Sequence, residues 1–348
     1  MVDHQRKAVR PPQFLTPQVP LAPYTTLRVG GEARWFGVVE TIEELREAAQ
    51  FAKQTALPFR VIGGGSNLLV PDEGYDGVVV QNAMKGIQFQ PVRTDIVLVT
   101  VGAGEILDEV IAEMVTRGYW GLENLSAIPG TVGATPIQNV GAYGVEVSDQ
   151  IVSVECYHPA SDTVHTMPAS ACQFGYRDSW FKTTVGREQV ITSVTFMVST
   201  TPRPQLTYAD LARALSASAS LEEIRSTIVM IRKEKFPDWT RVGTAGSFFK
   251  NPIITKALAT DLKTQYPDLP VYPVSDTHMK VSLGYILDKV CGLKGYADGG
   301  VSLYAKQALV LVNEQSSAAR INRFEKVVTD IVSTKTNITI EREVTLLA

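Results

Sequence analysis

IPGTVGATPIQNVGAYG, residues 128–144, is a long segment rich in glycine, proline and small side chains, with no sustained helical or strand period. A loop of this length inside a folded domain is uncommon unless it has a function. A second glycine-rich segment, GGGSN at 63–67, directly follows a strand predicted over 59–62. Consecutive glycines after a strand let backbone N–H groups approach a diphosphate closely. Two such loops in one chain therefore predict a site for a long diphosphate cofactor.

Neither loop carries a dinucleotide or nucleotide signature by itself. GGGSN lacks the spaced G-x-G-x-x-G pattern and the lysine of a P-loop, and taken alone it could be a plain turn. Residues 128–144 could likewise be a flexible surface loop. The occurrence of both, with Asn and Gln side chains that offer further donors and acceptors, favours the cofactor site.

The rest of the chain predicts alternating helices and strands. Thr41 and Glu44 form a capping box for a helix over 41–55, and Ser220 and Glu223 cap another that ends near Lys235. Further strands are predicted at 78–80, 96–101, 151–158, 189–198, 308–312 and 338–346, and further helices at 105–117, 255–265, 282–291 and 316–335. The middle of the chain resembles α+β architecture with antiparallel pairs.

Composition describes an ordinary folded protein. The chain is 45% hydrophobic and 20% charged, and its 33 Lys and Arg nearly balance 36 Asp and Glu, for a formal charge of −3. This balance predicts no partnership with nucleic acid or an anionic membrane surface. No window approaches a membrane span, and the N-terminus lacks the order of a secretion signal. We expect a cytoplasmic, monomeric protein.

The cysteines and histidines favour no metal site. Cys156, Cys172 and Cys291 are isolated and odd in number, so we expect buried thiols rather than disulfides or zinc ligands. The four histidines are scattered, and no pair has the i, i+4 spacing of a helical metal site. We expect no metal.

Length and composition changes predict several parts. Residues 1–23 form an extended, proline-rich lead-in, followed by subdomains at 24–90 and 91–215 and a C-terminal domain at 216–348. The last strand of that domain is expected to return to the cofactor site.

Five segments in order carry a specific resemblance. These are IGGGSNLLV (62–70), GLENLSAIPGTVGATPIQNVGAYG (121–144), FGYRDSWF (174–181), GTAGSFFKNP (243–252) and IEREV (340–344). The series resembles that of the UDP-N-acetylenolpyruvoylglucosamine reductase (MurB) family of peptidoglycan synthesis, over nearly the whole chain from about Tyr24 to Val344. TYADL at 207–211 is similar to the tyrosine loop of the longer family version.

The resemblance implies a fold and an activity. The fold would be α+β, with a two-subdomain FAD-binding module of the vanillyl-alcohol-oxidase (PCMH) type followed by a smaller α+β substrate-binding domain. NADPH would pass a hydride to non-covalently bound FAD, and the reduced flavin would pass it to C3 of the enolpyruvyl group of UDP-N-acetylglucosamine enolpyruvate. Protonation at C2 would then yield UDP-N-acetylmuramate.

The resemblance also implies which residues hold the cofactor. They come from both glycine-rich loops: Ile62, Gly63, Gly64, Gly65, Ser66, Asn67, Leu68, Ile128, Pro129, Gly130, Val132, Gly133, Ala134, Gln138, Asn139, Gly141, Ala142, Tyr143 and Gly144.

Three residues match the family's catalytic positions. Arg177 would stabilise negative charge on the enolic carboxylate, Ser247 would donate the proton, and Glu343 would orient the substrate or help relay that proton. Each has an ordinary alternative: an Arg paired with Asp178, a serine in a turn, and a solvated glutamate.

The remaining matches concern the substrate. Lysines are commonly surface charges and aromatic residues commonly belong to the core, but the family pattern places these positions at the sugar nucleotide. The implied substrate-binding residues are Tyr176, Arg177, Tyr208, Lys235, Ser247, Lys250, Asn251, Gln307 and Glu343.

The terminal motif departs from the family. Members often have Pro between its two acids and Arg two residues after the second, where this chain has Arg342 and Thr345. We expect Arg342 to replace the missing arginine only in part, because successive side chains of a strand face opposite sides.

Two alternatives remain. One is an FAD-linked oxidase of an alcohol or sugar on the same scaffold, although neither glycine-rich loop contains a histidine that could tether flavin covalently. The other is a sugar-nucleotide-binding protein without catalysis, which Arg177, Ser247 and Glu343 together disfavour.

Overall fold

Residue contacts in the computed structural model, which describes residues 9–347, divide the chain into two compact units. The first contains Glu32–Gly64, Tyr75–Val229 and the described residues up to Val19. The second contains Pro20–Gly31, Gly65–Gly74 and the described residues from Met230 onward. The three-part division expected from the sequence stays a prediction.

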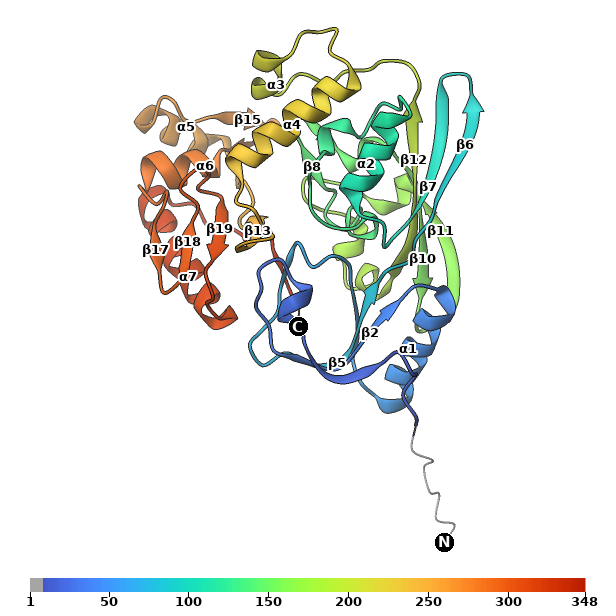
Figure 1. Ribbon diagram of the computed structural model, residues 1–348. Helices are drawn as coiled ribbons and strands as arrows, with labels where there is room; N and C mark the ends of the chain where they lie inside the picture. The colour runs from blue at the N-terminus through green and yellow to red at the C-terminus, as the bar shows by residue number, and fades with distance from the viewer. Residues whose placement is uncertain (1–8, 348) are drawn as a thin grey trace. The chain divides into compact units, whose positions relative to one another are not determined.

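The first sheet of the first unit has the order β1-β2-β5-β3. Its strands are β1 (Thr16–Pro20), β2 (Glu32–Val39), β3 (Phe59–Ile62) and β5 (Tyr75–Asn82), with β2 and β3 parallel to β5. The helix α1 (Ile42–Thr55) connects β2 to β3 and packs its buried face on this sheet (Figure 1). The predicted helix and capping box are confirmed, because Thr41 and Glu44 exchange side-chain and backbone hydrogen bonds.

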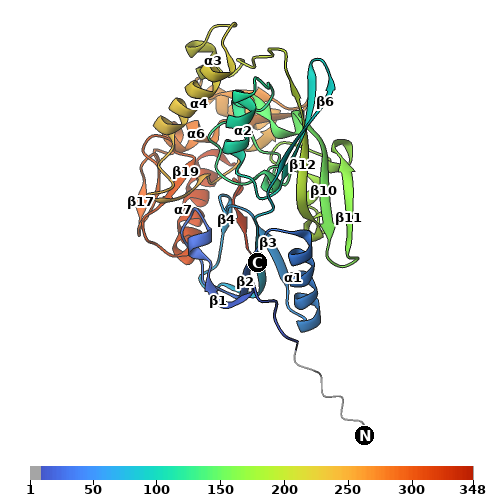
Figure 2. The same ribbon diagram turned by 45° about the vertical axis from the view of Figure 1, so that its right-hand side comes forward.

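The second sheet of the first unit is antiparallel, in the order β11-β10-β12-β7-β6. The strands are β6 (Ile87–Arg93), β7 (Ile96–Gly102), β10 (Ile151–His158), β11 (Thr163–Pro168) and β12 (Val190–Ser199), side by side in Figures 1 and 2. The predicted antiparallel middle region is confirmed. The helix α2 (Leu107–Thr116) begins two residues after the predicted Glu105, whose backbone oxygen instead accepts from the Val132 N–H.

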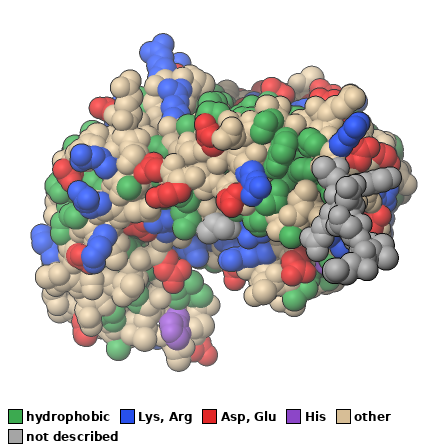
Figure 3. All heavy atoms as spheres, turned by 90° about the horizontal axis from the view of Figure 1, so that it is seen from below, with side chains coloured by type: hydrophobic (Ala, Val, Ile, Leu, Met, Phe, Trp, Pro, Cys, Tyr) green, Lys and Arg blue, Asp and Glu red, His purple; other side chains and the backbone are tan. Residues whose placement is uncertain are grey.

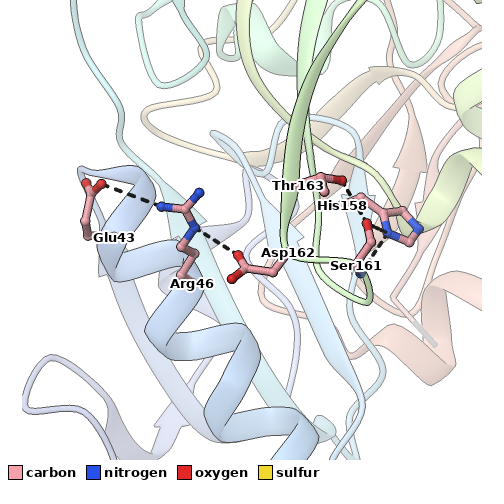
Figure 4. Close-up of polar contacts among 6 residues, drawn as sticks. All are labelled: Glu43, Arg46, His158, Ser161, Asp162 and Thr163. Atoms are coloured by element: carbon pink, nitrogen blue, oxygen red, sulfur yellow. Dashed lines mark hydrogen bonds and ion pairs between the residues drawn. The ribbon is translucent and has the colours of Figure 1, made fainter.

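Side chains also join α1 to the β10–β11 hairpin, as Figure 4 shows. Arg46 pairs with Glu43 and Asp162, and His158 contacts Ser161 in the same hairpin. Because these pairs are partly exposed, they contribute little to stability. The buried contact is Tyr157 against the α1 core, and burial raises the pKa of that tyrosine to about 12.

The second unit contains two small sheets. β13 (Gly243–Ser247), β19 (Val310–Asn313), β18 (Val301–Leu303) and β17 (Ala297–Asp298) form one, and β14 (Ile253–Thr255), β16 (His278–Val281) and β15 (Val271–Pro273) form the other. Helices α5 (Lys256–Gln265), α6 (Leu283–Tyr285) and α7 (Ala318–Thr336) pack on one apolar core. A short pair joins β4 (Leu68–Leu69) to β20 (Thr345–Leu346). The helix α4 (Leu221–Lys235) crosses the division between the units and ends as predicted.

The predicted strand 338–346 is wrong for most of its length, because only Thr345–Leu346 is a strand. Ile338, Ile340 and Val344 are buried in the core of the second unit. The alternation that suggested a strand thus reflects burial of an extended segment that mostly lacks a pairing partner. The predicted helix 282–291 is confirmed as the helical segment Leu283–Val290, whose second part, Ile286–Val290, is π-helical.

The N-terminal lead-in expected over 1–23 is only partly irregular. Thr16–Pro20 forms β1, and a short 3₁₀ turn covers Ala22–Tyr24. Residues 1–8 lie outside the described part of the chain.

All three cysteines are buried free thiols, as predicted. Burial raises the pKa of Cys156 to about 12 and that of Cys172 to about 11. Within residues 9–347, no group of three or more His, Cys, Asp or Glu side chains could hold a metal ion. No helix in this range is long and apolar enough to cross a membrane. On the face drawn in Figure 3, acidic and basic side chains are interspersed.

Candidate active site

The two glycine-rich loops meet in the first unit. A Cβ on Gly63 would lie 2.3 Å from Thr131 Oγ1, and one on Gly64 would lie 3.3 Å from the Cα of Gly130. A side chain at Gly63 would therefore collide with the second loop. The start of the first loop therefore lies against the second loop, although Gly63 and Gly130 are 67 residues apart in the sequence.

The end of the first loop belongs to the second unit, where it meets the C-terminal segment. Gly65 has φ +62°, and a Cβ there would lie 1.9 Å from the Tyr24 oxygen, so only glycine fits. Asn67 donates from Nδ2 to the Glu343 oxygen at 3.3 Å, and its own oxygen accepts from the Thr345 N–H at 3.0 Å. The structure thus brings predicted cofactor and catalytic residues together across 276 positions of sequence.

Backbone hydrogen bonds fix the first half of the second loop. Gly130 accepts from the Leu107 N–H at 3.1 Å, and Gly133 donates to Ala103 at 2.9 Å. A 3₁₀ turn over Val132–Ala134 follows directly from this anchoring to the start of α2.

Asn139 links the second half of that loop to the turn that carries Arg177. Its buried side chain donates from Nδ2 to Glu146 Oε2 at 2.7 Å and to the Gly175 oxygen at 3.0 Å. Its Oδ1 accepts from the Ser148 N–H at 3.1 Å. Both amide hydrogens and the amide oxygen are used within the protein, which makes Asn139 a positioning residue. Its predicted contact with the cofactor stays a prediction.

Arg177 sits in a tight turn with a left-handed backbone, φ 52°. Gly175 and Asp178 close this turn with two backbone hydrogen bonds of 3.0 and 3.1 Å. The guanidinium donates to the Gly141 oxygen at 2.6 Å, and Lys182 Nζ donates to the Arg177 oxygen at 2.5 Å. A non-glycine residue in this conformation is costly and persists where its surroundings hold it. The arginine is therefore fixed to the second glycine-rich loop.

The predicted tyrosine loop packs on the same glycine-rich loop. The exposed Tyr208 ring meets the Tyr143 ring edge-on, with centroids 5.2 Å apart. Asn124 Nδ2 donates to the oxygens of Tyr143 and Gln205 at 2.9 and 2.8 Å. The structure brings Tyr208, Tyr143 and Arg177 onto one loop system within the first unit.

Ser247 and Glu343 lie on adjacent segments of the second unit. Ser247 ends β13 and pairs with Val310 of β19. The next residue, Phe248, accepts from the Glu343 N–H at 2.8 Å. One backbone hydrogen bond therefore separates the two segments that the sequence predicted to act together.

The other predicted substrate residues of the second unit are half-buried rather than fully exposed. Lys250 bonds through its backbone N–H to the Glu341 oxygen at 3.0 Å, and its Nζ lies 3.3 Å from Glu341 Oε2. Asn251 Oδ1 accepts from the Leu283 N–H at 3.0 Å, at the start of α6, where Gln307 also lies. Lys235 ends α4.

Several residues that hold these groups carry no signal in the sequence. Thr131, Lys182 and Asn124 support the first unit's loops, and Glu325 supports the segment of Glu343 through Arg342. Their roles depend on contacts between distant segments. Arg177 belongs to the first unit and Ser247 and Glu343 to the second, so their predicted meeting at one substrate stays a prediction.

Comparisons with known proteins agree over most of the chain. Residues 36–167 match a family model described as an FAD binding domain, and residues 238–347 match the C-terminal domain of UDP-N-acetylenolpyruvoylglucosamine reductase. The chain is 38% identical over 338 residues to the reductase of that name from Ralstonia nicotianae, covering 95% of this chain and 98% of that one. It is 42% identical over 308 residues to the Neisseria gonorrhoeae reductase, covering 86% and 87%.

A solved structure shows the same fold. The crystal structure of UDP-N-acetylenolpyruvylglucosamine reductase from Thermus caldophilus superposes with a TM-score of 0.68 at 27% identity, covering 96% of this chain and 100% of that one.

Proposed function

The chain belongs to the UDP-N-acetylenolpyruvoylglucosamine reductase family of FAD-dependent oxidoreductases, and from this premise we propose its substrate, reductant and proton donor. The substrate is UDP-N-acetylglucosamine enolpyruvate, the reductant is NADPH, and Ser247 protonates C2. The observation that carries the proposal is the hydrogen-bonded arrangement of the Asn67, Ser247 and Glu343 segments.

The glycine-rich loops support a site for FAD. A Cβ at Gly63 or Gly65 would collide with Thr131 or Tyr24, so glycine lets these backbones lie close to their neighbours. Closely placed backbone N–H groups of such loops are the donors that a diphosphate needs. We propose that residues 62–68 and 128–144 hold the cofactor. When bound, FAD supplies the hydride relay between NADPH and C3 of the enolpyruvyl group.

Arg177 and Tyr176 would act on the enolpyruvyl carboxylate. Negative charge grows on that carboxylate as C3 is reduced, and a cation held in place beforehand stabilises it without reorganising. The Gly141 oxygen and the closed turn hold Arg177 in one position. That rigidity supports a catalytic role.

Ser247 would donate its hydroxyl proton to C2 as general acid. Glu343, on the adjacent segment, would orient the substrate or help return a proton to the serine. Lys235, Lys250, Asn251 and Gln307 would bind the sugar nucleotide together with Tyr208, because their amines, amides and phenol suit a diphosphate and its polar rings.

The test is anaerobic stopped-flow absorbance with the variant Ser247→Ala. NADPH should bleach the bound flavin at the wild-type rate, while recolouring by UDP-N-acetylglucosamine enolpyruvate should slow by about 10²–10⁴-fold, the usual contribution of a general acid. The control is Ser302→Ala on β18, two strands away in the same sheet, which should recolour normally. Normal recolouring in Ser247→Ala would refute the serine assignment.

The same experiment tests the two alternative functions, an oxidase and a binding protein without catalysis. A colourless protein would indicate a binding module, and flavin reduction by an alcohol or sugar with oxygen consumption would indicate an oxidase. The monomeric state and the cytoplasmic location stay predictions, which sedimentation and cell fractionation can check.

A further inference from the structure

Arg342 has an unusually complete set of partners for a residue beside a candidate catalytic group. Its Nε donates to Glu325 Oε1 at 3.0 Å, and one terminal nitrogen contacts Glu325 Oε2 and Asn322 Oδ1, the latter at 2.7 Å. The guanidinium carbon lies 5.6 Å from the centre of the Phe248 ring. The ion pair is mostly buried. A two-pronged pair of this kind fixes geometry as well as charge.

The exposed fraction is 21% for the Arg342 side chain and 17% for the Glu325 side chain, so water screens this pair weakly.

The segment that contains Arg342 is anchored by the buried Ile340 and Val344 and by the Asn67 bond to the Glu343 oxygen, but it has few strand contacts. It lies outside any strand until Thr345, and its two ladder bonds run from the Lys250 N–H to the Glu341 oxygen and from the Glu343 N–H to the Phe248 oxygen. These bonds are the ones that place Glu343 beside the Ser247 strand. A tether from Arg342 to α7 therefore acts on the position of Glu343.

We infer that Arg342 is a positioning residue, whose ion pair with Glu325 of α7 holds Glu343 in register with the end of β13. The inference rests on the proposed role of Glu343. Arg342 acts here through the backbone of its neighbour and through Phe248, without touching the substrate.

The ladder geometry supplies a sharp test. Arg342 faces Phe249 in an isolated antiparallel bridge, and the two flanking hydrogen bonds use the N–H groups of Lys250 and Glu343. The N–H of Arg342 thus takes no part in this ladder, so proline can stand there without removing a ladder bond. Proline at position 342 also restricts residue 341 to extended backbone. It would therefore stiffen the segment even without the ion pair to Glu325.

The experiment compares Arg342→Ala, Arg342→Pro, Glu325→Gln and the double variant Arg342→Pro/Glu325→Gln in the flavin-loaded protein. Recolouring by UDP-N-acetylglucosamine enolpyruvate should slow by about 10–100-fold in Arg342→Ala and Glu325→Gln, because small misplacements of catalytic groups are costly. Flavin reduction by NADPH should stay at the wild-type rate. Arg342→Pro should recolour within about threefold of wild type, and adding Glu325→Gln to it should change nothing further, since the pair is already absent.

The controls separate failure of this inference from failure of the proposed function. Asp330→Asn breaks the exposed pair with Lys326 on the same helix and should leave both rates unchanged.

Glu343→Gln tests the proposed function directly: a normal recolouring rate in that variant refutes the role of Glu343, whatever the Arg342 variants show. If Glu343→Gln is slow and Arg342→Ala is normal, the positioning role is refuted. Arg342→Pro as slow as Arg342→Ala would also refute it and would assign the effect to the charge itself. If Arg342→Ala fails to fold, the recolouring rate of Glu325→Gln is compared with that of the double variant instead. A slow Glu325→Gln with a double variant near the wild-type rate supports the positioning role, and any other result refutes it.

Discussion

The Arg177 turn and the Ser247 segment are held by different means. Arg177 lies in irregular backbone, where Asn139, Tyr143 and Arg177 itself have left-handed φ of 44°, 49° and 52°. Side chains bonded to backbone carbonyls hold that region. Ser247 instead lies at the end of a strand paired with β19. The Arg177 side chain therefore helps to hold the turn in which it lies. Ser247, in contrast, is positioned by backbone pairing that does not involve its side chain.

This difference predicts how substitutions behave. In the Arg177 region, a changed side chain should disturb structure and activity together. In the Ser247 region, the two should separate, as the predicted retention of flavin reduction in Ser247→Ala would show.

After Ser247→Ala, the largest expected effect is that of Arg177→Lys. Lysine keeps the charge but lacks the planar fork, so it cannot reproduce the bond to the Gly141 oxygen together with the contact to the Asn139 oxygen at 3.4 Å. We expect the rate of flavin recolouring to fall by about 10²–10³-fold, the cost of losing one preorganised donor to a developing negative charge. The melting temperature should fall as well.

Stopped-flow absorbance and thermal melts measure these two effects. Arg187→Lys, at an exposed position of the same region, is the control and should change neither. A slow Arg177→Lys variant with an unchanged melting temperature would break the comparison, because the arginine would then be catalytic without being structural.

The second prediction concerns Asn139→Asp, which keeps the shape but removes both Nδ2 donors. The new carboxylate would face Glu146 Oε2 and the Gly175 oxygen, two acceptors it cannot satisfy while ionised. Breaking a buried network of this kind should lower the free energy of unfolding by about 2–4 kcal/mol. Chemical denaturation monitored by tryptophan fluorescence measures it.

Asn337→Asp is the matched control for Asn139→Asp. Asn337 also has a left-handed backbone, φ 54°, but it is the exposed C-terminal cap of α7. Its substitution should lower the free energy of unfolding by only about a few tenths of a kcal/mol, as expected for surface changes. Equal costs at the two positions would show that the Asn139 network adds nothing to the ordinary preference of asparagine for this conformation.

The sequence predicted elements whose signals are local. The capping box of α1 and the end of α4 at Lys235 depend on residues within a few positions, and the structure confirms both. The segment 338–344 was predicted wrongly because alternating burial resembles a strand even where the ladder is nearly absent. The period of apolar residues shows which side of a segment is buried, but it does not show whether a neighbouring strand pairs with that segment.

The candidate site was predictable only through the order of its motifs. Arg177, Ser247 and Glu343 were identified by resemblance, and their assignments stay predictions. Asn139 and Asn67 were named only as cofactor-binding residues. Their contacts were not predicted, because Asn139 reaches Gly175 across 36 positions and Asn67 reaches Glu343 across 276. No local pattern encodes such contacts.

The smallest expected effect comes from Glu123→Gln, in the 3₁₀ turn Glu123–Leu125 that precedes the second glycine-rich loop. Glu123 is buried, its Oε2 accepts from the Gly121 N–H at 2.6 Å, and burial raises the pKa of the carboxyl above its usual range. A raised pKa in the folded state means that the ionised form costs stability at neutral and higher pH, and that this cost disappears as the pH falls through the raised value.

Glutamine keeps an oxygen for the Gly121 N–H without the buried charge. The variant should therefore melt at a higher temperature than wild type at pH 8, and the difference should shrink as the pH is lowered and Glu123 takes up its proton. Melting curves across pH measure this, with Glu47→Gln on the exposed face of α1 as a control that should show no such trend. A lower melting temperature at pH 8 would mean that the charge of Glu123 itself holds the loop. The scaffold of the first region would then depend on electrostatics as well as on hydrogen-bond geometry, and its contrast with the Ser247 strand would be greater than the present contacts indicate.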